Sequence, residues 1–209
     1  MTFTIPIFPL PNVVLFPNVF LPLHIFEPRY RQMIAESLEG DRIIGMVLLR
    51  PGYQADYEGA PAIYQTGCSG LISHVERLED GRYNLVLRGL EKFTIRAEAP
   101  PEPRRLYRTA VATPVDERID DNARDRLRAL RGQLMQVLKP AFNGAIESRL
   151  PESMPDEDLI NALAQYLEFD PAEKLALLEQ PGPLARGTAM LELLQMKAML
   201  HGGDRGTLH

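Results

Sequence analysis

The stretch "PLHIFEPRY", Pro22–Tyr30, joins an apolar strand pattern to the start of a helix. Pro28 suits the first turn of a helix, where its missing N–H costs nothing, and this places Glu27 at the N-cap, where negative charge meets the helix dipole. Gly40 predicts a left-handed stop at the other end. The stretch therefore predicts a strand followed by a short helix in which each polar residue has a structural role. The expected buried face consists of Tyr30, Met33, Ile34 and Leu38.

The first half of the chain reads as a series of short strands. These segments are rich in β-branched and aromatic residues, and their prolines fall at edges or bends. Turn signals at Glu79–Gly81 and at Arg88–Gly89 suit a meander, with a strand break at Gly89. So many short strands predict a curled sheet or a small barrel, because closure removes exposed edges. The expected strands are Phe3–Phe8, Asn18–Phe26, Arg42–Arg50, Ile63–Leu78, Tyr83–Leu87, Lys92–Ile95 and Arg105–Val115.

From about Asp116 the apolar period changes to three and four, which is typical of helices. Asp170–Glu173 combines an N-cap acid, Pro at N1 and Glu at N3, a strong helix start. Further helices are expected over Pro155–Glu168 and Leu184–Leu200. The sequence therefore predicts an α+β chain: a β-rich domain with one short helix over 1–115, a helical bundle over 116–201 and a flexible tail over 202–209. The apolar face of the first bundle helix consists of Ile119, Ala123, Leu127, Leu130, Leu134 and Leu138.

Composition is that of an ordinary globular protein, with 209 residues, 45% hydrophobic and 24% charged. The net charge of −5 argues mildly against a nucleic-acid or anionic membrane surface. Cys68 is the single cysteine, so no intramolecular disulfide can form and a reducing compartment fits. Prolines interrupt the amino-terminal apolar run and no basic residue precedes Arg29, so neither an export signal nor a membrane span is expected. A cytoplasmic location follows.

Three segments resemble one known family. Pro6–Ile34, "PIFPLPNVVLFPNVFLPLHIFEPRYRQMI", looks like the opening of the amino-terminal, substrate-binding domain of Lon-type proteases. Asp80–Ile95, followed by Tyr107–Val115, is similar to the second signature block of that domain, and Glu173–Leu194 resembles its helical end. The resemblance covers nearly the whole chain. It implies a PUA-like β pseudo-barrel followed by a helical bundle, and a role in binding protein substrates.

Full-length Lon proteases add an ATPase module and a Ser-Lys peptidase module to this domain. The 209 residues end before either could begin, and they contain no G-x-x-x-x-G-K-[ST] phosphate loop. We therefore expect no enzymatic activity and no cofactor. The resemblance carries over the binding role alone, in an ATP-independent module like the stand-alone proteins of this family.

The sequence offers no catalytic constellation. Thr66–Gly70 lacks the nucleophile elbow G-x-S-x-G, because Leu71 stands where the second glycine should be. Cys68 lies in the middle of a strand and is expected to be a buried small hydrophobe. His24 and His74 lack the spacing of paired metal ligands. No catalytic, cofactor-binding or metal-binding residue is assigned.

RNA binding is the alternative function, because PUA-like folds often bind RNA. Arg124, Arg128 and Arg131 share one helix face, but acidic residues one turn earlier can pair with them. A solvated, ion-paired face is the favoured interpretation, and nucleic acid is not the expected partner. The acidic residues are Asp120, Asp121 and Asp125.

Two features favour protein binding. The segment Pro51–Tyr64 carries Tyr53, Tyr57 and Tyr64 among Gly, Pro and Ala, and exposed tyrosines make good contact anchors. A loop folded with its tyrosines inward explains the pattern equally well. The helix over Ala189–Leu200 is apolar nearly all round, which indicates a core helix or a second apolar face for a partner. Its candidate contact residues are Met190, Met196 and Met199.

The expected partners are unfolded proteins or exposed apolar protein segments. A protease or a chaperone is a further candidate partner, and a membrane is not. The sequence leaves open the identity of the client and whether the chain forms a homo-oligomer.

Overall fold

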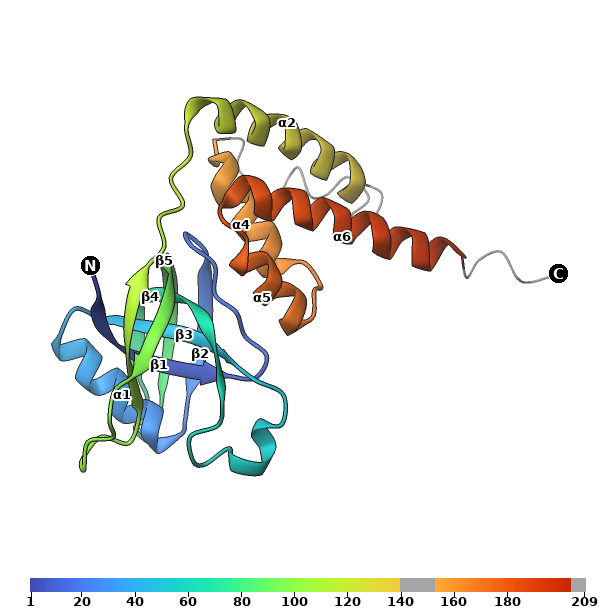
Figure 1. The fold of residues 1–209 in the computed structure, drawn as a ribbon. Coiled ribbons are helices and arrows are strands. Elements are labelled where there is room, and N and C mark those ends of the chain that lie inside the picture. The colour runs from blue at the N-terminus through green and yellow to red at the C-terminus, as the bar shows by residue number, and fades with distance from the viewer. Residues whose placement is uncertain (140–152, 204–209) are drawn as a thin grey trace. The chain divides into compact units, whose positions relative to one another are not determined.

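The computed structural model describes residues 1–139 and 153–203 and has the predicted α+β class (Figure 1). The β-rich part contains β1 (Phe3–Leu10), β2 (Phe20–Ile25), α1 (Pro28–Glu39), β3 (Ile43–Leu49), the 3₁₀ turn η1 (Tyr53–Asp56), β4 (Ile63–Arg77), β5 (Tyr83–Glu98) and β6 (Arg108–Pro114). The described helices that follow are α2 (Asp121–Leu138), α4 (Asp156–Tyr166), α5 (Pro171–Glu179) and α6 (Pro183–Gly203).

The chain divides into two compact units. The first unit comprises Met1–Asp116 together with Gln165–Leu178, and the second comprises the described parts of 117–164 and of 179 onward. Within the first unit, Gln165 Oε1 accepts a hydrogen bond from Phe16 N at 3.2 Å, and Tyr166 OH donates to Phe20 O at 2.7 Å. These two bonds tie the 165–178 segment to the connection between β1 and β2 and to the first residue of β2.

The sheet of the first unit closes on itself. Its strand order is β2-β5-β4-β3-β1-β6, and β6 also pairs with β5, so that five strands form a ring and β2 extends from β5. β1 and β3 pair in parallel, which requires a crossover, and β2 and α1 supply it. All other pairs are antiparallel.

The predicted strand break at Gly89 is wrong, because β5 continues through it. On one side, β5 pairs with β2 before Gly89 and with β6 after it, so the strand changes partners at this glycine instead of ending. The chain crosses closely here: a Cβ at position 89 would lie 2.0 Å from Phe16 O. Gly89 also exchanges backbone hydrogen bonds with Asn18 and Val19. Glycine is needed for this close approach of the backbone.

The core of the first unit lies inside the ring. It is built from alternate residues of the strands, as the pleat requires. Cys68 is fully buried, as predicted, but it follows Gly67, which pairs with Phe93, and so it faces the other side of the sheet and is not part of this cluster. The core cluster consists of Ile5, Ile7, Val47, Phe93, Ile95, Ala110 and Ala112.

Helix α1 begins as predicted, with Glu27 at the N-cap and Pro28 in the first turn, but it ends differently. Ser37 takes the buried position expected for Leu38, which is half-exposed. Gly40 does not adopt a left-handed conformation, since its φ is −108°. The left-handed residue is instead Arg42, with φ 63°. Both Gly40 N and Arg42 N donate to Ser37 O, so the chain turns two residues after Gly40. The other predicted members of the face, Tyr30, Met33 and Ile34, are buried.

The second unit is held by apolar packing and one buried cation. The side chain of Asp120 caps α2 by accepting from Ala123 N at 2.7 Å. Arg186 of α6 is completely buried and donates to Asn161 Oδ1 at 2.5 Å and to Glu117 Oε1 at 2.6 Å. The buried face of α2 consists of Leu127, Leu130, Leu134 and Leu138, four of the six residues predicted for it, whereas Ala123 is half-buried and Ile119 precedes the helix.

Helix α5 has the capping box predicted for it. Asp170 Oδ1 accepts from Glu173 N at 2.8 Å, and Glu173 Oε2 accepts from Asp170 N at 2.9 Å. None of the described helices combines the length and the apolarity needed to cross a bilayer. Most of the tail expected over 202–209 lies outside the described residues.

Candidate protein-binding groove

Three adjoining hollows lie in the first unit, where the start of α1, the segment 51–62 and the segment 99–107 come together. Their volumes are about 450, 380 and 40 Å³, and Leu106 lines all three. We call the hollow of about 450 Å³ the Leu106 groove. Its lining includes Phe26, Glu27, Arg29, Tyr57, Glu58 and Leu106.

The Leu106 groove has two exposed apolar side chains. Phe26, directly after β2, is 59% exposed, and Leu106, two residues before β6, is 62% exposed. Exposed apolar surface that gathers around a hollow is costly in water, and in soluble proteins it commonly marks a contact site. The two residues are 80 positions apart in the sequence, so only the fold brings them to one groove.

The polar side of the groove is a closed set of contacts among Glu27, Arg29 and Tyr57. Arg29 donates from Nη2 and Nε to Glu27 Oε2 at 2.8 and 2.9 Å, and from Nη1 to Tyr57 O at 3.0 Å. Tyr57 OH donates to Glu27 Oε1 at 2.9 Å, and the Arg29 guanidinium lies 4.9 Å from the centre of the Tyr57 ring. Burial, and then the hydrogen bond to the Glu27 carboxylate, raise the pKa of Tyr57. The phenol is therefore neutral at pH 7, and the charges of Glu27 and Arg29 cancel.

Glu27 occupies the predicted N-cap position of α1, but its side chain makes no capping hydrogen bond. Both carboxylate oxygens are engaged by Arg29 and Tyr57 instead. The residue expected to be part of the scaffold is thus also the residue that fixes the 51–62 segment against α1.

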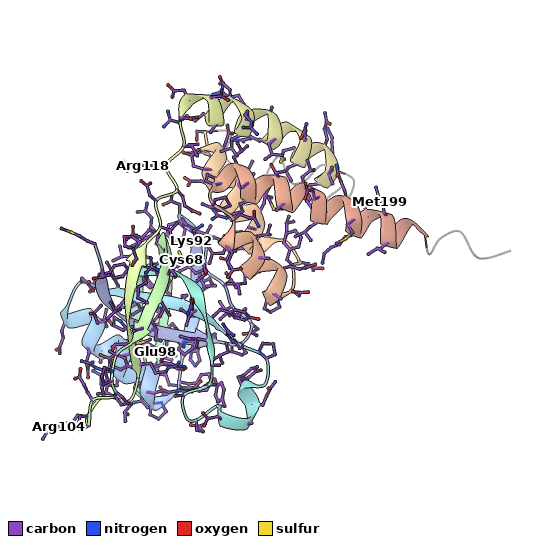
Figure 2. The ribbon with its side chains drawn as sticks, viewed as in Figure 1. Cys68, Lys92, Glu98, Arg104, Arg118 and Met199 are labelled. Carbon is purple, nitrogen blue, oxygen red and sulfur yellow. The ribbon has the colours of Figure 1, made fainter. Side chains whose placement is uncertain are left out.

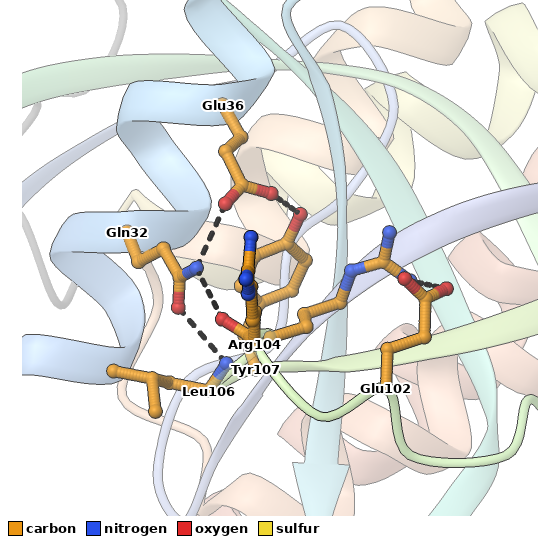
Figure 3. A network of polar contacts seen from close by, with 7 residues as sticks. Gln32, Glu36, Glu102, Arg104, Leu106 and Tyr107 are labelled. Atoms are coloured by element: carbon orange, nitrogen blue, oxygen red, sulfur yellow. Dashed lines mark hydrogen bonds and ion pairs between the residues drawn. The ribbon is translucent and has the colours of Figure 1, made fainter.

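Leu106 is held in place from α1 by contacts that we call the Gln32 brace, formed by Gln32, Glu36 and Tyr107 (Figure 3). Gln32 Nε2 donates to Arg104 O at 2.8 Å, and Gln32 Oε1 accepts from Leu106 N at 2.9 Å. The side-chain amide thereby bonds the backbone on both sides of residue 105, as a neighbouring strand would. The side chain of Leu106 is therefore exposed, while its backbone is held in place.

The second half of the Gln32 brace is the contact between Tyr107 and Glu36. Tyr107 OH donates to Glu36 Oε2 at 2.5 Å, and Gln32 Nε2 donates to Glu36 Oε1 at 2.8 Å (Figure 3). Burial, and then the hydrogen bond to Glu36, raise the pKa of Tyr107 to about 12. The Tyr107 hydroxyl therefore keeps its proton, and with it the hydrogen bond to Glu36, at any physiological pH.

The three tyrosines of the 51–64 segment lie in different surroundings, and all three are half-buried. Tyr57 lines the Leu106 groove. The Tyr53 ring centre lies 6.0 Å from that of Tyr57 but is not part of the lining, and Tyr64, on β4, lies beneath the Arg50 guanidinium at 5.2 Å. Only Tyr57 thus shares a groove with other exposed apolar residues.

The three methionines of α6, in the second unit, also differ. Met190 is completely buried, whereas Met196 is 50% and Met199 76% exposed, and Leu200 next to them is exposed as well (Figure 2). We call the exposed part, Met196, Met199 and Leu200, the α6 methionine face. The structure does not bring it together with the tyrosines into one unit.

The residues considered for catalysis, metal or RNA have ordinary contacts. His24 Nδ1 shares a hydrogen bond with Asn84 Oδ1 at 2.8 Å, and among the described residues no three His, Cys, Asp or Glu side chains gather as metal ligands. Arg124 and Arg128 pair with acids one turn earlier, as predicted. Arg131 pairs instead with Asp156 of α4, at 2.9 Å.

Phe26, Gln32, Glu36 and Leu106 were not predicted as functional. In the sequence, Leu106 is a single leucine within the proline- and arginine-rich stretch 101–108, and this alone does not indicate a contact site. The role of Gln32 depends on a contact with a loop more than seventy residues away.

Comparison with known proteins finds one family. A family model described as the ATP-dependent protease La (LON) substrate-binding domain matches residues 4–196. Lon protease 2 of Myxococcus xanthus is 26% identical over 198 residues, covering 92% of this chain, and Lon protease 2 of Syntrophobacter fumaroxidans is 28% identical over 188 residues, covering 84%. The chain spans about a quarter of the length of these curated relatives.

Solved structures show the same fold. A Lon N-terminal domain protein from Xanthomonas campestris has a TM-score of 0.62 at 19% identity, covering 91% of this chain and 98% of that one. The N-terminal domain of a Mycobacterium avium complex Lon protease has a TM-score of 0.66 at 17% identity, covering 92% and 98%. With the family model spanning nearly the whole chain, this protein belongs to the family of the LON substrate-binding domain.

Proposed function

We propose that this chain is a non-catalytic module that binds unfolded proteins through their exposed apolar segments, and that it does so at the Leu106 groove. The observation that carries the proposal is that Phe26 and Leu106 are both exposed and both line one hollow of about 450 Å³. A large apolar side chain of a client would remove both from water, at about 25 cal/mol per Å² of apolar surface buried.

The rigid backing of the groove supports this proposal. Contacts that fix a binding surface in advance reduce the conformational entropy lost when a ligand binds. The Gln32 brace fixes the backbone of Leu106, and the Glu27, Arg29 and Tyr57 contacts fix the segment 51–62. Membership of the LON substrate-binding domain family supports a client of protein nature.

The proposal has further parts. We propose that the closed sheet of the first unit is a PUA-like pseudo-barrel and that the second unit is a helical bundle. The module would work without an ATPase or peptidase of its own, in the cytoplasm, and it would deliver or protect clients with a separate protease or chaperone. A buried Cys68 as the single cysteine is compatible with a reducing compartment.

Binding of a labelled protein that has been reduced and carboxymethylated, compared with the folded form of the same protein, tests the function. We expect binding of the unfolded form only. The double variant Phe26→Ser with Leu106→Ser should weaken it about tenfold, as expected for a pair of contact anchors. The matched variant Met196→Ser with Met199→Ser removes equally exposed apolar side chains from the α6 methionine face and should leave it unchanged.

Three results would contradict the proposal. Preference for the folded form would refute recognition of unfolded clients. Loss of binding only in the methionine variant would move the site to α6. Binding of single-stranded RNA that falls steeply with salt, with no binding of the unfolded protein, would favour the RNA-binding alternative.

A further inference from the structure

The charges around the Leu106 groove do not balance. Arg29 is paired with Glu27 through both Nε and Nη2, so these two contribute no net charge. The remaining charged residue of the lining is Glu58. It is exposed, and its carboxylate makes no hydrogen bond or ion pair with the described residues. The groove therefore combines exposed apolar surface with one uncompensated negative charge.

Of the two surrounding segments, the one that carries Glu58 reinforces this charge. Segment 51–62 contains Asp56 and Glu58 and no basic residue. The Asp56 carboxylate is used within the loop, because Oδ2 accepts from Ala60 N at 3.2 Å. In the neighbouring segment, Arg105 is paired with Glu102, while Arg104 is exposed, lies outside the groove lining and projects away from the unit (Figure 2).

A purely apolar ligand fits this groove poorly. It would cover Phe26 and Leu106, but it would also displace water from the Glu58 carboxylate without replacing the lost hydration. A lysine or arginine next to the apolar side chain restores a partner for the carboxylate at the same time. An acidic neighbour would instead add repulsion in a site of lowered dielectric.

Resting on the proposed function, we infer that the Leu106 groove selects client segments in which a large apolar side chain stands next to a lysine or arginine, and that Glu58 reads the positive charge. The apolar side chain supplies most of the affinity. The basic neighbour supplies the discrimination between apolar segments.

Three labelled peptides of equal length test this inference, each with one central phenylalanine followed by lysine, glutamine or glutamate. Fluorescence anisotropy at low salt should show the lysine peptide binding about two- to fivefold more tightly than the glutamine peptide, as expected for one exposed ion pair. The glutamate peptide should bind weakest. Added salt should reduce the difference between the lysine and glutamine peptides.

Two variants test whether Glu58 causes the preference for the lysine peptide. Glu58→Gln should bring the affinity ratio of the lysine and glutamine peptides close to one. Glu39→Gln makes the same charge change at the exposed last residue of α1, about 17 Å along the helix axis from the groove end at ~1.5 Å per residue, and should leave the ratio unaltered.

The outcomes separate the inference from the function on which it rests. Equal binding of the lysine and glutamine peptides, or a ratio that Glu58→Gln does not change, would overturn the inference and leave the proposed function standing. Tighter binding of the glutamate peptide would overturn it too and would point to Arg104. If neither the three peptides nor an unfolded protein binds, the proposed function fails.

Discussion

The Leu106 groove and the α6 methionine face both expose large apolar side chains, yet they differ in what lies behind them. Gln32 bonds the Leu106 N–H and the Arg104 carbonyl, and Tyr57 is bonded to Glu27. On the methionine face no hollow among those described is lined by Met196, Met199 or Leu200. The exposed apolar side chains alone would not rank the groove above the methionine face, whereas the polar contacts behind the groove distinguish it.

The largest effect should come from Arg186, which lies with both of its partners in the second unit. Arg186→Ala leaves Glu117 and Asn161 without this buried partner, and we expect the free energy of unfolding to fall by about 3–5 kcal/mol. Urea denaturation measures the loss. Peptide binding at the groove, assayed without denaturant, should persist if the groove does not depend on the second unit.

A matched double variant sharpens this experiment. Arg186→Met with Glu117→Gln removes both charges of the pair, and it should cost less than Arg186→Ala because no buried charge is stranded. If the single variant abolishes peptide binding in native buffer while the double variant keeps it, the second unit supports the groove and the two surfaces are not independent.

The next effect should come from loosening the Gln32 brace. Gln32→Ala leaves Leu106 itself unchanged but removes both backbone bonds to segment 104–106, so peptide affinity should fall about three- to tenfold through the added ordering cost. Hydrogen exchange of the Leu106 amide reports the cause directly, because this N–H is bonded to Gln32 Oε1.

Glu39→Ala is the control on the same helix, since Glu39 is exposed at the far end of α1. It should alter neither the affinity nor the exchange rate. Unchanged affinity in Gln32→Ala, despite a faster-exchanging Leu106 amide, would show that backbone rigidity is not what distinguishes the groove.

A smaller effect should appear only in alkali. The pKa of Tyr107 is raised to about 12 in the folded chain, against about 10 for an unperturbed tyrosine, so the unfolded chain loses this proton first. The contribution of Tyr107 to stability is therefore complete below about pH 10 and is lost as the pH rises towards about 12.

The comparison of wild type with Tyr107→Phe isolates this group from the other tyrosines. The urea midpoint of the wild type should fall more steeply than that of the variant across this window. Parallel curves would mean that Tyr107 does not hold its proton for Glu36 in solution.

The smallest effect should come from the methionine face itself. Met196→Ser with Met199→Ser should change the free energy of unfolding by less than about 1 kcal/mol, as is usual for two exposed positions, and should leave peptide affinity intact. A tenfold loss of affinity would reverse the ranking of the two surfaces. Thermal unfolding of the same sample would show whether that loss is local.

Much of the fold could be predicted because local patterns determine it. β-branched runs gave the strands, the apolar spacing gave the described helices, and the residues of the Asp170–Glu173 start predicted its capping box. One error came where a distant contact determines the role of a residue. Gly89 does not end β5, because the glycine is there to let the Phe16 backbone pass close beside the strand. A second error is local: the left-handed residue after α1 is Arg42 and not Gly40, and both N–H groups donate to Ser37 O.

The groove could be predicted only in part. Tyr57 was a candidate because tyrosines on a glycine- and proline-rich loop suggest contacts, and it lies in the lining. Phe26 and Leu106 carry no shared sequence signal, since their proximity arises from the meeting of α1 with the 99–107 segment. The charge of Glu58 becomes informative only once Arg29 is known to be neutralised by Glu27.

Closure of the sheet has a consequence for the proposed binding of unfolded chains. Among the described strands only β2 has a single neighbour, and its open edge is poorly suited to recruiting another strand. Pro22 offers no N–H, and the Phe20 carbonyl already accepts from Tyr166. Under the proposed function, an extended client would therefore find few main-chain partners on this edge and would be held mainly through side chains. Binding of this kind would give a client strand no edge on which to extend the sheet, and sheet extension is the step by which strands join aggregates.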